Sequence, residues 1–352
     1  MKKFLIVLLS LTLVFALPIN EVEDSLEDDV PEDGWFVPQK DGSLKWMTEE
    51  EAQIQARAQL MSRKKSKEAK VEFYLYTAEF PNEGHQIYIG DSANLKMSSF
   101  NSENPTRIII HGWQNNYKSD VNTEIREALF SMGEYNVISV DWSDKADRYN
   151  YVSAAGAVSE IGQRVAHLIE FLRDEGNVKN EDLIVIGHSL GAHVAGFAGK
   201  TIEGEQIHTI IGLDTAFPLF KYDKCDERLC STDAMYVESI HTNGKLLGFI
   251  QPIGQVAFYP NGGKTQPGCG LDMSGTCSHS RAYIYYAESI RQNFLGLKCD
   301  DWKTAVKKNC LAGGQGTMAG FSHAYNYMKL DGTFYSPVDK KSPYSLLTKY
   351  NT

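Results

Sequence analysis

A turn of the form Gly-x-Ser-x-Gly, with a β-branched run before it and small residues after it, constrains the fold of this chain more than any other stretch. Residues 183–186 predict a buried strand, and the small residues after Gly191 predict a helix. Gly187 and Gly191 flank Ser189 because a side chain at either position of so tight a turn would clash with neighbouring strands. A strand, a sharp turn and a helix in this order are the setting in which a serine becomes a nucleophile. The N–H of Leu190, at the helix start, is then placed to donate to a developing oxyanion.

Strand-like and helix-like patterns alternate through the middle of the chain. Val158, Ile161, Val165 and Leu168 recur at three- and four-residue spacing and predict an amphipathic helix. Apolar or β-branched runs predict strands at residues 71–76, 86–89, 107–110, 136–142, 183–186 and 207–213. This alternation favours an α/β fold with a mostly parallel central sheet covered by helices.

Length and charge exclude several classes of protein. The chain has 352 residues, 42% of them hydrophobic, which fits one large α/β domain or two small ones. Its net charge of −10 argues against a nucleic-acid partner and against electrostatic attraction to an anionic membrane surface. Any contact with lipid therefore has to be hydrophobic.

The first residues have the pattern of a secretory signal. Two lysines precede an apolar run over residues 4–17, which is too short to span a bilayer, and small residues favour a cut after Ala16. No later stretch approaches ~18 apolar residues. We therefore predict a signal peptide over residues 1–16 and a secreted, extracellular protein.

Residues 17–65 differ in composition from the rest of the chain. The stretch begins with many acidic residues, continues with a capping box at Thr48 and Glu51, and ends in a basic cluster over residues 63–67. Such a cluster suits a trypsin-like protease. The stretch is either a prosegment that an activating protease removes or an N-terminal arm packed on a catalytic domain over residues 66–352.

All six cysteines lie in the last third of the chain. In an oxidising compartment they are better explained as disulfides than as metal ligands, and we predict no metal site. Pairing between sequence neighbours is favoured because each pair closes a short glycine- or charge-rich loop. The predicted pairs are Cys225 with Cys230, Cys269 with Cys277, and Cys299 with Cys310.

A serine nucleophile needs a base to take its proton and an acid to orient that base. Asp214 is the first acid at the end of a predicted strand after Ser189, whereas Asp141 precedes the serine and is interpreted as a turn or cap residue. Without such partners the turn would be a plain glycine-rich connection.

Three histidines follow Asp214 and are candidates for the base: His241, His279 and His323. The second of them stands on a loop pinned by a predicted disulfide, just before an aromatic helix, but the residues alone do not choose it over His241. Trp113, after a predicted strand, is the expected second oxyanion donor through its N–H.

Several motifs in the same order make the resemblance to a known family specific. They are Ile110-His111-Gly112-Trp113, Gly187 to His193, Gly212-Leu213-Asp214, Ile240-His241-Thr242, Phe258 to Gly263, Pro267-Gly268-Cys269 and Cys277 to Ala282. Together they resemble the pancreatic lipase family of α/β-hydrolases over residues 70–335. The resemblance implies Ser189 as nucleophile, Asp214 as acid and His279 as base, with oxyanion donors at Leu190 and Trp113.

The resemblance also implies a function and some departures from the family. It implies a serine lipid-ester hydrolase that needs no cofactor, and the cysteine-rich segment after Asp214 predicts no calcium where vertebrate relatives hold one. The chain ends near Thr352, so we expect no C-terminal β-sandwich and no colipase partner. Only seven residues separate Cys269 from Cys277, which are too few for the lid helix of lipases.

A short lid is similar to that of the insect secreted phospholipase A1-like branch of the family. We therefore expect an uncovered site that releases the sn-1 fatty acid from phospholipids. Two alternatives stay open. One is a triacylglycerol or galactolipid lipase, and the other is a non-catalytic lipid-binding relative similar to insect yolk proteins.

Overall fold

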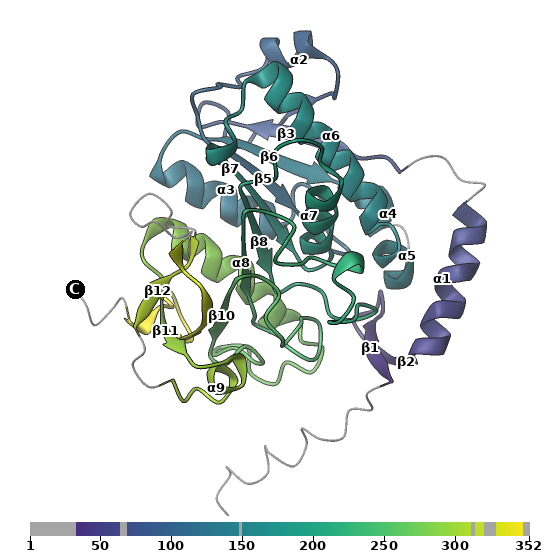
Figure 1. Cartoon of the computed structure of the whole chain (residues 1–352), viewed down its shortest axis with the longest axis vertical. Helices are drawn as coiled ribbons and strands as arrows, with labels where there is room; N and C mark the ends of the chain where they lie inside the picture. The colour runs from purple at the N-terminus through teal and green to yellow at the C-terminus, as the bar shows by residue number, and fades with distance from the viewer. Residues whose placement is uncertain (1–32, 64–68, 148–149, 311–313, 320–328, 348–352) are drawn as a thin grey trace, which may run out of the picture.

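The computed structural model describes residues 33–63, 69–147, 150–310, 314–319 and 329–347. The predicted signal peptide and the acidic stretch before residue 33 lie outside these ranges. Within them, eleven strands form one sheet and two more form a separate hairpin (Figure 1). The strands are β1 (Gly34–Pro38), β2 (Leu44–Thr48), β3 (Glu72–Tyr76), β4 (His85–Ile87), β5 (Thr106–Ile110), β6 (Asn136–Asp141), β7 (Leu183–His188), β8 (Thr209–Leu213), β9 (Tyr236–Ile240), β10 (Val256–Pro260), β11 (Leu295–Cys299), β12 (Gln315–Thr317) and β13 (Gly332–Ser336).

The helices lie mainly between these strands in the sequence. They are α1 (Glu49–Arg63), α2 (Ser92–Met97), α3 (Asp120–Met132), α4 (Ser143–Ala146), α5 (Tyr151–Ala155), α6 (Val158–Gly176), α7 (Leu190–Thr201), α8 (Thr276–Arg291) and α9 (Trp302–Val306), with 3₁₀ turns η3 (Asn180–Asp182) and η4 (Cys225–Glu227). Among the described residues, no helix is both long enough and apolar enough to cross a bilayer.

The large sheet is parallel at its centre and antiparallel at its edges. Its order is β12-β11-β13-β10-β9-β8-β7-β5-β6-β3-β4. Every pairing from β6 across to β13 is parallel, whereas β3 and β4 at one edge and β11 and β12 at the other pair antiparallel. The predicted mostly parallel α/β sheet is confirmed.

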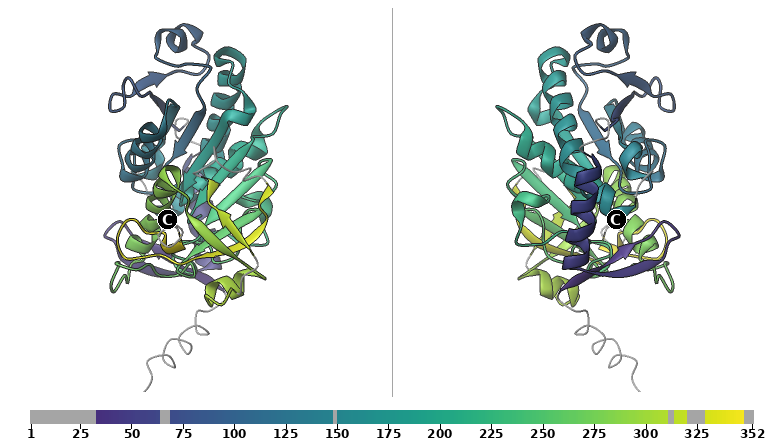
Figure 2. Two further views of the ribbon diagram at one scale, coloured as in Figure 1. Left: turned by 90° about the vertical axis from the view of Figure 1, so that its left-hand side faces the viewer. Right: turned by 90° about the vertical axis from the view of Figure 1, so that its right-hand side faces the viewer.

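Both faces of the sheet are covered, and alternation along β5 shows why. Ile108 and Ile110 pack in one apolar cluster with residues of α6 and α7, while Ile109 packs in another with residues of α3 and α8. Because successive side chains of a strand point to opposite faces, a strand this apolar has to be buried on both sides. Figure 2 shows the two helical layers on either side of the twisted sheet.

The described part of the N-terminal stretch packs on the domain. Trp35, Val37 and Met47 of the β1–β2 hairpin are buried in the same cluster as the central strands. The predicted capping box is present, because the Glu51 N–H donates to Thr48 Oγ1 at 3.3 Å and the Thr48 N–H donates to Glu51 Oε2 at 3.0 Å. The hairpin and the start of α1 thus pack on the domain, and whether the stretch is a prosegment that a protease removes or a permanent arm stays a prediction.

The cysteines pair as predicted. The structure joins Cys225 to Cys230, Cys269 to Cys277 and Cys299 to Cys310. Each disulfide closes a short loop, and the middle one lies at the start of α8.

The carboxyl group of Glu238 predicts a pH-dependent stability. It is fully buried in β9 and accepts hydrogen bonds from Tyr236 Oη and the Ala319 N–H, while burial raises its pKa from 4.5 to about 7. The folded protein thus holds this proton more tightly than the unfolded chain does. The protonated Glu238 carboxyl group therefore makes its full contribution to the free energy of unfolding below about pH 4.5. This contribution is lost as the pH rises through about 7.

Glu238→Gln keeps the side chain neutral at every pH and removes this loss. We expect the melting temperature of the variant, relative to the wild type, to rise between pH 5 and pH 8. Calorimetry of both proteins across that range measures the difference. A difference that does not change with pH would contradict the assignment.

Candidate active site

The predicted Ser189 turn has the expected strained geometry. Ser189 follows β7 and precedes α7, with a φ of 57° that a non-glycine residue rarely adopts. A Cβ at Gly191 would lie 2.2 Å from the Ile110 carbonyl oxygen, and one at Gly187 would lie 2.3 Å from the Gly191 carbonyl oxygen. Both glycines are therefore required by close approach of the backbone, as the sequence predicted.

Asp214, directly after β8, contacts His279 of α8, which lies 65 residues further along the chain. Asp214 Oδ2 lies 2.5 Å from His279 Nδ1, and the carboxyl group is fully buried. Its other oxygen accepts hydrogen bonds from the backbone N–H groups of Thr242 and Asn243 at 2.7 and 2.9 Å. These donors stabilise the ionised carboxylate and fix which way it faces.

His279 is placed differently from the sequence expectation. It lies in the first turn of α8, not on a loop before a helix, because α8 already begins at Thr276. Asp272, which the sequence analysis missed, accepts hydrogen bonds from the N–H groups of Cys277 and Ser278 at 3.2 and 2.6 Å. Together with the Cys269–Cys277 disulfide, this cap holds the start of the helix that carries His279.

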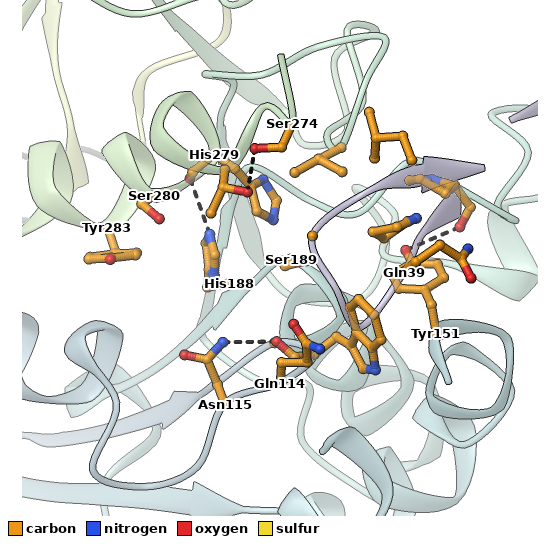
Figure 3. A pocket seen from close by; sticks show the side chains of 18 residues that line it. Gln39, Gln114, Asn115, Tyr151, His188, Ser189, Ser274, His279, Ser280 and Tyr283 are labelled. Carbon is orange, nitrogen blue, oxygen red and sulfur yellow. Dashed lines mark hydrogen bonds between the residues drawn. The ribbon is translucent and has the colours of Figure 1, made fainter. Parts of the chain in front are cut away.

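His188 supports the same helix from the Ser189 turn. Its Nε2 lies 3.2 Å from the His279 carbonyl oxygen, and the two rings are 4.5 Å apart between centroids (Figure 3). Burial, followed by the nearby charge of His279, holds the pKa of His188 well below its ordinary value. A neutral His188 can therefore donate its Nε2–H to that carbonyl and position the backbone of His279.

The two other candidate bases have different outcomes. His241 is fully buried, with Nε2 2.8 Å from Ser239 Oγ and Nδ1 2.7 Å from the Phe249 carbonyl oxygen. Both ring nitrogens are thus held by the core, and burial lowers its pKa. His323 lies outside the described residues.

The loop after β5 brings Trp113 to the serine. A Cβ at Gly112 would lie only 2.8 Å from Ser189 Cβ, so only glycine permits this approach. His111 and Trp142 brace the loop, since Trp142 Nε1 donates to the His111 carbonyl oxygen at 2.8 Å. Trp113, directly after Gly112, lines the same pocket as Ser189, and its role as an oxyanion donor stays a prediction.

Asp141 serves as a cap, as the sequence analysis interpreted it. Its Oδ1 accepts a hydrogen bond from the Ser143 N–H at 2.9 Å at the start of α4. It takes no part in the pair that Asp214 forms with His279.

One pocket joins these groups, and it has two chemically different sides. Ser189 and His279 both line it. Figure 3 shows Ser280 and Tyr283 on one side of Ser189 and Gln39 and Tyr151 on the other. Next to Tyr151 lie Trp113, in edge-to-face contact with it, and Pro218, whose carbonyl oxygen accepts from Tyr151 Oη at 3.2 Å. Pro38, Leu44 and Leu247 are further apolar residues that line the pocket.

In the segment after Asp214, for which the sequence analysis predicted no calcium, two positive side chains bind oxygens of the chain. Lys200 Nζ contacts both oxygens of Asp233 at 2.5 and 2.6 Å, and Arg228 donates to the carbonyl oxygens of Tyr222 and Leu229. The Asp233 carboxylate and these two carbonyl oxygens are thus already bound by positive side chains, which makes them poor ligands for a cation. A second group of possible ligands, Cys269, Asp272 and Cys277, includes two sulfurs that are joined as a disulfide.

The sequence can now be compared with known proteins. A sequence model described as Lipase matches residues 42–344, which is most of the chain. The chain belongs to the lipase family. This confirms the resemblance, and the sheet and its covering helices are those of an α/β-hydrolase.

Relatives within the family carry more than one name. Phospholipase A1 VesT1.02 of Vespa tropica is 36% identical over 294 residues, which cover 78% of this chain and 94% of that protein. Pancreatic lipase-related protein 2 of Myocastor coypus is 36% identical over 262 residues, covering 68% and 55%. Pancreatic triacylglycerol lipase of Cavia porcellus is 34% identical over 277 residues, covering 72% and 59%. The chain thus spans little more than half the length of the pancreatic relatives.

The sequence analysis missed the part of the pocket that comes from β1 and β2. It expected an uncovered site, but Pro38 and Leu44 of this hairpin line the pocket. A signal was present, because an Asp-Gly turn at Asp41 and Gly42 separates two runs rich in aromatic and apolar residues. Of the loop from Cys269 to Cys277, Ser274 and Thr276 line the pocket, whereas Leu271 and Met273 are exposed, so the uncovered site stays a prediction.

The geometry predicts different effects for the two candidate bases. We expect His279→Ala to slow the reaction of Ser189 with an alkyl fluorophosphonate by a factor on the order of 10³ or more, without a large change in melting temperature. His241→Ala should lower the melting temperature, because it removes the buried hydrogen bonds to Ser239 Oγ and to the Phe249 carbonyl oxygen, but it should leave labelling of the folded protein nearly unchanged.

The measurement is the second-order labelling rate, followed by intact mass, together with the melting temperature of each variant. Ser189→Ala is the matched control for the site of labelling. If His241→Ala abolished labelling while His279→Ala kept it, the base would be wrongly assigned.

Proposed function

We propose that this protein is a secreted serine hydrolase of lipid esters, most specifically a phospholipase A1. The observation that carries the proposal is the contact of 2.5 Å between the buried Asp214 carboxylate and His279, in a pocket that Ser189 also lines. An acid, a base and a strained serine in this arrangement suit acyl transfer.

The proposed reaction assigns a defined role to each residue. Ser189 Oγ attacks the acyl carbonyl carbon while His279 Nε2 takes its proton, and Asp214 keeps the proton of the ring on Nδ1. The N–H groups of Leu190 and Trp113 stabilise the oxyanion. His279 then protonates the leaving alcohol, and a water molecule, deprotonated by the same ring, releases the fatty acid from Ser189.

Two observations support a phospholipid as substrate. The Vespa tropica relative that matches over 94% of its own length is named a phospholipase A1. In the loop from Cys269 to Cys277, the polar Ser274 lines the pocket, whereas the apolar Leu271 and Met273 do not line it and are 90% and 77% exposed. The polar side of the pocket, with Ser280, is then open to a charged head group.

Secretion and proteolytic processing belong to the same proposal. Three disulfides suit an oxidising compartment, and the pattern of residues 1–16 suits a signal peptide. A trypsin-like protease that cut the basic cluster over residues 63–67 would leave the buried side chains of β1 and β2 in contact with the domain.

The proposal predicts a preference for phospholipid over neutral lipid. On phosphatidylcholine vesicles we expect release of the sn-1 fatty acid, at a rate about tenfold or more above that on emulsified triolein at equal enzyme concentration. The measurement is the rate of fatty-acid release, with positional analysis of the lysophospholipid by mass spectrometry.

Ser189→Ala, added under the same conditions, corrects for contaminating activity. A clear preference for triolein, or for a galactolipid, would show that the proposed substrate is wrong and would leave the assignment of the catalytic residues unchanged. No hydrolysis and no labelling by a fluorophosphonate would favour a non-catalytic lipid-binding protein and overturn the proposal.

A further inference from the structure

The β1–β2 hairpin reaches the candidate active site from about 150 residues away in sequence. Pro38, Gln39, Gly42 and Leu44 line the pocket that contains Ser189. In Figure 3 the hairpin ribbon arches beside the serine, with Gln39 at its turn. A segment outside the central sheet thus forms part of the wall next to the reacting ester.

The pairing register gives the hairpin two distinct faces. Trp35 pairs with Met47 on one face, and Phe36 pairs with Trp46 on the other. Side chains of cross-strand partners share a face, and neighbours along a strand alternate. The face of Trp35, Val37 and Met47 is buried against the core, with exposures of 8%, 1% and 3%.

Polar contacts also fix the hairpin to the domain. Gln114 Nε2, in the loop after β5, donates to the Lys40 carbonyl oxygen at 3.3 Å. Lys40 Nζ donates to the Asp147 carbonyl oxygen at 2.5 Å. After β2, Glu49 forms an ion pair of 2.6 Å with Lys221. With one face buried and both ends held, the hairpin is a fixed wall.

The opposite face is an apolar stripe that leads out of the pocket. Pro38 and Leu44 form a cross-strand pair inside it, and Phe36 and Trp46 form the next pair on the same face. The two rings contact each other edge to face, with centroids 5.0 Å apart, and Phe36 stays 37% exposed. The stripe is therefore available for an apolar ligand.

Other residues that line this pocket are also apolar. Trp113 and Tyr151 contact each other edge to face, and Pro218 and Leu247 extend this surface. Figure 3 places Gln39 of the hairpin and Tyr151 on the side of Ser189 away from Ser280 and Tyr283, and we call this part of the pocket the slot. An extended hydrocarbon chain attached to the ester carbonyl suits this slot, because its burial is favourable along its whole length.

We propose that the hairpin face of Pro38, Leu44, Trp46 and Phe36 binds the acyl chain of the substrate and sets the preference for chain length. This inference rests on the proposed ester hydrolysis. The carbons nearest the carbonyl lie against Pro38 and Leu44. Trp46 lies two residues along the strand, about 7 Å further, and contacts only longer chains.

The test compares soluble p-nitrophenyl esters with acyl chains of four, eight and twelve carbons. Leu44→Ala is expected to lower kcat/KM roughly tenfold for the eight- and twelve-carbon esters and less than twofold for the four-carbon ester. Trp46→Ala is expected to lower kcat/KM only for the twelve-carbon ester.

Two further variants control for folding and for chemistry. Lys45→Ala, at the exposed position between the two tested residues, should leave all three values unchanged, and Leu44→Met should restore the wild-type profile. Melting temperatures identify any variant that has lost its fold.

The outcomes separate this inference from the proposed function. Equal losses on all three esters, or an unchanged profile in Leu44→Ala and Trp46→Ala, would overturn the role of the hairpin and leave the ester hydrolase in place. A wild-type protein that hydrolyses none of the esters would overturn both.

Discussion

The hydrogen bond between Asp214 and His279 is the interaction on which the rest of the candidate site depends. Burying a carboxylate costs free energy unless its oxygens accept hydrogen bonds. Here two backbone N–H groups and one imidazole form hydrogen bonds with the Asp214 carboxylate. The N–H donors come from the loop after β9, and the imidazole comes from α8. These elements have to be in place before Asp214 can lie where it does, so the sheet order and the position of α8 are part of the site.

The serine side of the site is held by close backbone packing instead. Gly187, Gly191 and Gly112 let the β7–α7 turn and the loop after β5 approach each other more closely than any side chain would permit. The positive φ of Ser189 is kept by that packing. His188 connects the serine side of the site to the Asp214–His279 pair. It is the last residue of β7, directly before Ser189, and its ring contacts the carbonyl oxygen of His279.

The sequence was most informative where a pattern is local. The runs 107–110 and 136–142 have a strand period, the Ser189 turn has its glycines, and neighbouring cysteines close short loops, so each of these predictions needed little knowledge of the fold. The choice between His241 and His279 could not be made this way, because both follow Asp214 and only tertiary packing decides which ring faces the pocket. Composition alone did not predict that Leu44, in a stretch interpreted as a prosegment or arm, lies beside Ser189.

The central claim is that Asp214 fixes the tautomer of His279 that can accept the proton of Ser189. Asp214→Asn tests it most directly, since the amide keeps the size of the side chain and can still accept from Thr242 and Asn243. Its NH₂ group would favour the tautomer with the proton on Nε2, which cannot act as the base. We predict that kcat for p-nitrophenyl butyrate falls on the order of 10⁴-fold while the protein stays folded by calorimetry. A folded variant whose kcat falls less than about tenfold would contradict the account.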